Sequence, residues 1–218
     1  MSSIPGFRRH DSSADVPAIH TAAEFEARRL ELPEGGRFHE LHDGQLKLLS
    51  TPEEIHGTIV FNISRMLATF LPQQLQARGY ACFGLGLHVG SNPDTVYAPA
   101  ISVFHTGSPF SQNDRIVASE IPSLVVDIAS TNDRRAEMRL RTMACLNHGV
   151  ETIWIPDPFK KEVQVISKGQ HTLALGVWQT LTGHGQLAGF SMPVASIFAE
   201  PEWWDGKLPV CSTPEMPE

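Results

Sequence analysis

The chain has 218 residues, which is long enough for one sizeable hydrophobic core and marginal for two. Hydrophobic residues make up 41% and charged residues 19%, a composition that is typical of soluble globular proteins and excludes global disorder. The 17 basic and 24 acidic residues give a net charge of −7. This charge argues against avid, non-specific binding of DNA phosphates, although it leaves room for a local basic site.

Segments for export or membrane insertion are not expected. No apolar run approaches the roughly 18 to 20 residues of a membrane span, and the first residues lack the apolar core of a secretory signal. Cys82, Cys145 and Cys211 are far apart and odd in number, which favours reduced thiols over a disulfide framework. The sequence therefore predicts a cytoplasmic protein without a membrane partner.

Composition divides the chain into three parts. Residues 1–20 are polar and interrupted by prolines, so we expect a mobile N-terminal arm. Residues 21–200 carry the helix and strand patterns of a single domain. Residues 201–218 predict an irregular, proline-containing tail, in which Trp203 and Trp204 either pack on their own domain or serve in oligomerisation.

The first half of the domain has strong helix and turn signals. A short helix is predicted after Thr21, which has capping-box spacing to Glu24. A hairpin follows, with alternating strands around the turn at Asp43-Gly44. The stretch "TPEEIHGTIVFNISRMLATFL" then predicts a long amphipathic helix with Thr51 as its N-cap and Pro52 at its first position.

Strands and a second helix make up the rest of the domain. We expect strands in "YACFGLGLHVG", in "TVYAPAISVF" (residues 95–104) and, deeply buried, in "IPSLVVDIAS". The stretch "TNDRRAEMRLRTMACLNHG" predicts a helix that ends at Gly149, followed by a strand and a hairpin turning at Lys168-Gly169. This order of elements predicts a mixed α/β or α+β fold.

Asp127 is the most informative single residue. An ionised carboxylate inside the apolar run "LVVDIA" is costly to bury unless it binds a cation or has a partner. A functional role and a structural ion pair are equally consistent with this position, and Arg141 on the following helix is the expected partner. The nearby arginines 134, 135 and 139 are expected to form a solvated helix face.

The segment "FHELH" contains further candidates. His39 and His42 are three residues apart on a predicted strand and point to opposite faces, so a zinc site of the metalloprotease type is not expected. Glu40 shares a face with His42, and its simplest interpretation is a solvent-facing acid of the hairpin.

Taken in order, these landmarks resemble the Uma-two family of bacterial restriction-endonuclease-like proteins, a branch of the PD-(D/E)XK nuclease superfamily. The family hairpin "E-L-x-D-G-x-L" is similar to "ELHDGQL", which begins at Glu40, and a helical histidine is similar to His56 in "EEIHGTI". The Pro-Asp strand end is similar to Pro99-Ala100, and "V-V-E-V-x-S" is similar to "VVDIAS". A helical lysine followed by "A-G-V-x-E-Y-W-x-V-D-P" is similar to Arg141 followed by "HGVETIWIPDP".

The resemblance implies a restriction-endonuclease-like core, with a mixed central sheet flanked by helices and an N-terminal helix and hairpin. It also implies hydrolysis of DNA phosphodiester bonds with Mg²⁺ or Mn²⁺, in which carboxylates hold the metal and a lysine stabilises developing charge. Carried over to this chain, the metal ligands are Glu40 and Asp127, and the further catalytic positions are Arg141 and His56.

The chain departs from the family pattern at three of these positions. Ala100 replaces the Pro-Asp aspartate and removes a metal ligand, Asp127 is one methylene shorter than glutamate, and Arg141 replaces the lysine. We therefore expect weak or lost endonuclease activity. The alternatives are a non-catalytic relative that binds nucleic acid or a protein partner, and an oligomerising protein, for which a symmetric dimer is the default.

Overall fold

The structure is a computed structural model that describes residues 18–73, 79–106, 108 and 110–200. Most of the predicted N-terminal arm (residues 1–20) and the whole predicted tail (residues 201–218), with Trp203 and Trp204, lie outside the described residues.

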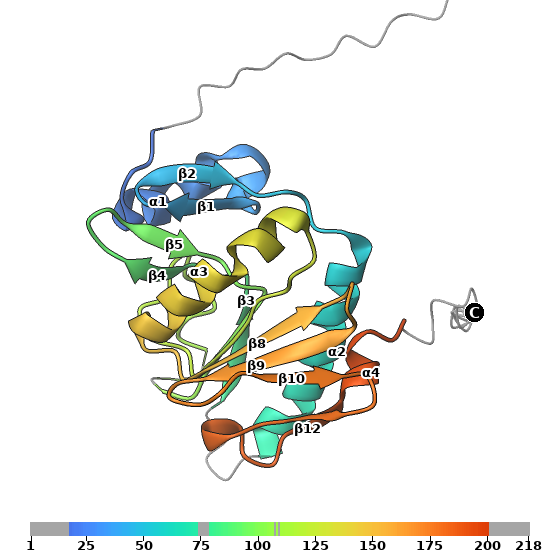
Figure 1. Cartoon of the computed structure of the whole chain (residues 1–218). Coiled ribbons are helices and arrows are strands. Elements are labelled where there is room, and N and C mark those ends of the chain that lie inside the picture. Colours follow the sequence, from blue (N-terminus) through green and yellow to red (C-terminus); the bar gives the residue numbers. More distant parts are fainter. Residues whose placement is uncertain (1–17, 74–78, 107, 109, 201–218) are drawn as a thin grey trace, which may run out of the picture.

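A six-stranded mixed sheet forms the centre of the fold, with strand order β10-β9-β8-β7-β6-β3 (Figure 1). The parallel pair is β7 with β8, and each of the other neighbouring pairs is antiparallel. The strands are β3 (Tyr80–Phe83), β6 (Ile101–Phe104), β7 (Leu124–Val126), β8 (Thr152–Asp157), β9 (Glu162–Ser167) and β10 (Leu173–Gly176).

A second, four-stranded antiparallel sheet has the order β2-β1-β5-β4. Its strands are β1 (His39–His42), β2 (Gln45–Leu48), β4 (Leu87–Gly90) and β5 (Thr95–Tyr97), and a small separate pair is formed by β11 (Thr180–Thr182) and β12 (Ser191–Pro193). Figure 1 shows the four-stranded sheet at one end of the molecule, beyond α3.

The α-helices of the described residues are α1 (Ala22–Arg28), α2 (Glu54–Phe70), α3 (Asn132–His148) and α4 (Val194–Ile197), with short 3₁₀ turns at Arg29–Glu31, Pro33–Gly36, Leu71–Gln73 and Gly185–Leu187. The two long helices, α2 and α3, lie on opposite faces of the central sheet. Alternate residues of β7 point to opposite faces, as in any strand. Leu124 and Val126 pack in the cluster that contains α2 residues such as Ile63, whereas Val125 packs with Met138 of α3.

The main sequence predictions for the fold are confirmed. The central sheet is mixed and flanked by helices, and the N-terminal helix and hairpin are present. Thr21 and Glu24 form a complete capping box at α1, and Gly149 ends α3 with a left-handed φ of 118°. None of the helices in the described ranges has the length and apolar character needed to cross a bilayer.

Two local predictions are wrong. The helix α2 begins at Glu54 after an extended Glu53, and no side chain caps it, so Thr51 is not its N-cap. Just before this segment, the Ser50 hydroxyl donates to Asp133 in the first turn of α3, which ties the chain to another helix.

The stretch over residues 95–104 is two strands rather than one. β5 belongs to the four-stranded sheet and β6 to the central sheet, and Ala98–Ala100 connects them. Pro99, which has no N–H to donate, lies in this connection and not inside either ladder. The chain therefore passes from the four-stranded sheet to the central sheet through Ala98–Ala100.

Candidate functional site

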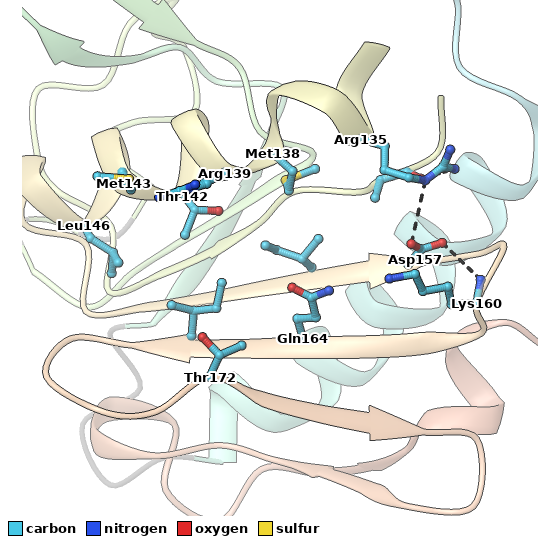
Figure 2. A pocket seen from close by; sticks show the side chains of 13 residues that line it. Arg135, Met138, Arg139, Thr142, Met143, Leu146, Asp157, Lys160, Gln164 and Thr172 are labelled. Atoms are coloured by element: carbon cyan, nitrogen blue, oxygen red, sulfur yellow. Dashed lines mark hydrogen bonds and ion pairs between the residues drawn. The ribbon is translucent and has the colours of Figure 1, made fainter. Parts of the chain in front are cut away.

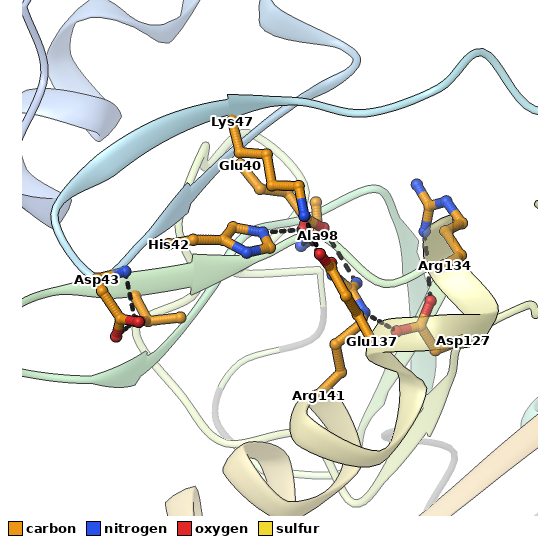
Figure 3. Close-up of polar contacts among 10 residues, drawn as sticks. Glu40, His42, Asp43, Lys47, Ala98, Asp127, Arg134, Glu137 and Arg141 are labelled. Atoms are coloured by element: carbon orange, nitrogen blue, oxygen red, sulfur yellow. Dashed lines mark hydrogen bonds and ion pairs between the residues drawn. The ribbon is translucent and has the colours of Figure 1, made fainter. Parts of the chain in front are cut away.

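The candidate site is a buried network in which Arg141 bridges two carboxylates (Figure 3). Its guanidinium donates to Glu40 through Nη1 (2.5 Å to Oε2) and Nη2 (3.0 Å to Oε1). Its Nε donates to Asp127 Oδ2 at 2.5 Å. Bidentate, charge-assisted pairs of this kind fix both orientation and distance. The predicted Asp127–Arg141 ion pair is therefore confirmed, and Glu40 is added to it.

Three separate elements position these side chains. Glu40 is the second residue of β1, Asp127 directly follows β7, and Arg141 lies in the middle of α3. The Asp127 backbone N–H donates to Trp154 O of β8, which extends the parallel ladder by one bond and fixes the carboxylate at the end of the strand. The network thereby connects the two sheets and the helix.

Glu40 is fully buried, with 0% of its surface exposed, so its interpretation as a solvent-facing acid is wrong. Both faces of β1 are covered here, because Leu41 packs with Phe25 of α1 on one face and α3 covers Glu40 on the other. Oε1 accepts the backbone N–H of Ala98 at 2.7 Å, and Oε2 lies 2.8 Å from Nε2 of His42. Together with Arg141, these contacts give each carboxylate oxygen two partners.

The charges of the network stabilise one another. Burial by itself raises the pKa of Glu40, but the Arg141 charge and the hydrogen bonds from His42, Arg141 and Ala98 lower it to about 2. Burial also opposes the charge of Arg141, yet Asp127 and Glu40 raise its pKa above the ordinary value. The Arg141 guanidinium additionally lies 4.5 Å from the centre of the Tyr97 ring. Arg141 offsets one of the two carboxylate charges, and Arg134 beside Asp127 supplies a second cation.

Arg134 is a second cation of the site, and the prediction that it lies on a solvated helix face is wrong. It is buried rather than solvated, and its Nη1 lies 3.4 Å from Asp127 Oδ1. Within the described part of the chain its Nε has no hydrogen-bond partner. Arg135 is also engaged, because its guanidinium stacks 4.3 Å above the Phe159 ring. The seven-residue spacing between Arg134 and Arg141 puts both arginines on one helix face, and this spacing could have indicated from the sequence that Arg134 belongs to the site.

His56 lies beside the network without a hydrogen bond to either carboxylate. Its Nδ1 is 2.9 Å from Oγ of the fully buried Ser130, which follows Asp127 in the β7–α3 connection. Burial and the Arg134 charge lower the pKa of His56 to about 4, against the opposing effect of Asp127. The imidazole is therefore neutral near pH 7, and a catalytic role for it stays a prediction.

Ala100 lies next to Asp127. The antiparallel register of β6 and β7 pairs Ile101 with Val126, and one further step places Ala100 opposite Asp127. The alanine contributes only a methyl group, packed against the apolar cluster of α2 and the central sheet. The position that the resemblance assigns to a metal-binding aspartate therefore offers no oxygen ligand.

An ion pair on the outer side of the network was not foreseen. Lys47 is directly opposite Glu40 in the hairpin, and its ammonium pairs with Glu137 of α3 (Figure 3). Glu137 is four residues before Arg141 and so shares its helix face. The Lys47 side chain is 35% exposed, so this ion pair lies on the solvent-facing side of the network.

The side chains present do not fit a divalent cation of the kind that restriction-endonuclease-like families generally use. Both oxygens of Glu40 are already occupied by N–H groups, and the Arg141 cation stands between Glu40 and Asp127. Mg²⁺ requires several converging oxygen ligands. Among the described residues there is no group of three or more acidic, histidine or cysteine side chains that could hold a metal ion.

Comparisons with known proteins agree with the fold. A model of the Uma2 family, described as "Putative restriction endonuclease", matches residues 23–195. The chain is also similar to the crystal structure of a "putative nuclease belonging to DUF820" from Anabaena variabilis ATCC 29413, with a TM-score of 0.67 and 21% identity over 82% of this chain and 97% of that chain. At this identity the likeness shows the fold alone. No curated protein matches the chain significantly. Because the family model spans most of its length, the chain belongs to the Uma2 family of restriction-endonuclease-like proteins.

Proposed function

We propose that this chain is a nuclease-fold protein in which metal-dependent hydrolysis of DNA is weak or lost. The observation that carries the proposal is the Arg141 guanidinium, which is hydrogen-bonded to both Glu40 and Asp127. A cation held between two carboxylates supplies the charge compensation that a metal would otherwise provide.

The replacement at position 100 supports the same conclusion. A divalent cation would need to displace Arg141 and then find oxygen ligands, but the position opposite Asp127 offers only the methyl group of Ala100. Arginine also remains protonated at any accessible pH, so it cannot leave the site by losing its charge. The network therefore serves to join the two sheets rather than to carry a reaction.

A chain that has the nuclease fold but does not hydrolyse DNA would act by binding another molecule. Nucleic acid and a partner protein are the two candidates, and the net charge of −7 favours the protein partner. A gel-shift titration with double-stranded DNA at low salt separates them, since our proposal predicts no shift at protein concentrations in the micromolar range.

The direct test is nicking of supercoiled plasmid with Mg²⁺ or Mn²⁺. Wild type, Asp127→Asn, Glu40→Gln and Ala100→Asp are purified identically, and circular dichroism checks that each is folded. We expect wild type to nick no faster than Asp127→Asn. Metal-dependent nicking by wild type that disappears in both Asp127→Asn and Glu40→Gln would overturn the proposal, because contaminating nuclease would persist in the variants.

A further inference from the structure

A pocket of about 450 Å³ lies between α3 and the strands β8 and β9 (Figure 2). This volume falls within the range of sites that hold small organic ligands. The pocket uses the helix face that carries Met138, Met143 and Leu146, whereas Arg134 and Arg141 point to the buried network. It is therefore a separate site from the one described above.

Part of the pocket wall is apolar. Met138, Met143 and Leu146 line it from the helix, and Ile155 and Ile166 line it from the sheet. Methionine side chains are flexible and polarizable, so two of them on one wall adapt to the shape of a ligand. A hydrophobic ligand body would replace water against these five side chains.

A buried hydroxyl group in the same pocket lacks a partner. Thr142 is 8% exposed, and within the described ranges its Oγ1 makes no hydrogen bond. A threonine inside a helix ordinarily satisfies its hydroxyl by bonding to a carbonyl of the preceding turn. Here the Thr142 side chain lines the pocket while its Oγ1 is covered by neighbouring atoms, and Figure 2 shows Gln164 on the facing wall, on β9. The Gln164 amide can donate to and accept from a polar edge of a ligand.

The charge at the pocket is positive. Arg139 and Lys160 line it as exposed cations; Lys160 pairs with Glu162 at 3.4 Å, whereas Arg139 forms no ion pair with any described residue. The remaining charged pair cancels internally, since Arg135 lies 3.8 Å from Asp157, whose carboxylate also accepts the backbone N–H groups of Phe159 and Lys160. An anionic ligand group would therefore meet uncompensated positive charge.

We propose that this pocket binds a small organic anion, with its apolar body between α3 and the β8–β9 strands and its carboxylate or phosphate group at Arg139. The proposal does not depend on the state of the carboxylate–arginine network. It assigns a ligand class by the pairing of an apolar wall, the Gln164 amide and the unpaired Arg139 cation in one cavity.

The test uses the fluorescence of 8-anilinonaphthalene-1-sulfonate, an apolar organic anion, titrated into the full chain. The diagnostic variant is Met143→Glu, which places an acid on the wall of the pocket. Its matched control is Leu140→Glu, because Leu140 is on the same helix and 66% exposed but does not line the pocket. Both positions are exposed, so neither change is expected to unfold the protein.

We expect saturable binding at one site per chain, weakened about tenfold by Met143→Glu and by Arg139→Glu and unchanged by Leu140→Glu. Displacement of the dye by decanoate or by adenosine 5′-monophosphate would indicate a carboxylate or a phosphate monoester as the natural group. Dye binding that is equally weakened by Leu140→Glu, or unaffected by both Met143→Glu and Arg139→Glu, would overturn the proposal.

Discussion

The guanidinium of Arg141 donates two parallel hydrogen bonds to Glu40, a residue 101 positions earlier in the chain. Through its third donor the same side chain reaches Asp127 at the end of β7. One arginine on α3 thus joins the four-stranded sheet to the central sheet. A lysine, with a single ammonium group, cannot reproduce this planar arrangement of three bonds.

The first prediction concerns the removal of this cation. Arg141→Met keeps most of the side-chain volume but leaves Glu40 and Asp127 buried without their main partner. We expect the free energy of unfolding to fall by about 3–5 kcal/mol, measured by urea denaturation.

Arg139→Met is the matched control for that measurement, because Arg139 is an exposed arginine on the same helix without an ion pair to a described residue. Its effect should stay within about 0.5 kcal/mol. A similar, small effect for both variants would show that the buried network contributes little to stability.

The second prediction is that the free energy of unfolding depends on pH through the ionisation of Glu40. Its pKa is lowered in the folded protein from 4.5 to about 2. The unfolded chain therefore takes up a proton at higher pH than the folded one, and the stabilisation is complete above about pH 4.5 and lost as the pH falls toward about 2. The difference in unfolding free energy between wild type and Glu40→Gln should shrink over this interval in urea titrations.

Subtracting the unfolding free energy of Glu40→Gln from that of wild type at each pH removes the contribution of the other carboxyl groups, which are present in both proteins. A difference between the two proteins that stays constant from neutral pH to about pH 2.5 would mean that Glu40 is not held ionised by Arg141.

The third prediction concerns the outer pair of Lys47 and Glu137. Because Lys47 is 35% exposed, water screens its attraction to Glu137. A double-mutant cycle with Lys47→Met and Glu137→Gln should give a coupling energy of at most about 1 kcal/mol. A coupling energy as large as that of a buried pair would place this ion pair among the main stabilising contacts of the site.

Local signals in the sequence predicted much of this architecture. The capping box at Thr21 and Glu24, the Asp43-Gly44 turn and Gly149 each depend on a few neighbouring residues, and each is present in the structure. The partner of Asp127 was also predictable, because a buried acid requires a cation and Arg141 lies on the next helix. These features follow from short-range geometry and from the cost of burying charge.

Long-range features were not predictable in the same way. The burial of Glu40 depends on α3 covering the hairpin, and the strand pattern of "FHELH" cannot show which face is covered. The division of residues 95–104 between two sheets is likewise set by strand pairing across the fold, although Pro99 indicated an irregular point. The pocket beside Thr142 combines residues of α3 with β8 and β9, so no single segment indicated it.

The central claim, that Arg141 takes the place of a metal ion between Glu40 and Asp127, is tested most directly by calorimetric titration with Mn²⁺. We compare wild type with the double variant Ala100→Asp/Arg141→Lys, which restores a carboxylate opposite Asp127 and the smaller cation of the family pattern. The account predicts no saturable Mn²⁺ binding by wild type and one site in the double variant. One Mn²⁺ bound per wild-type chain, and lost in Asp127→Asn, would contradict it.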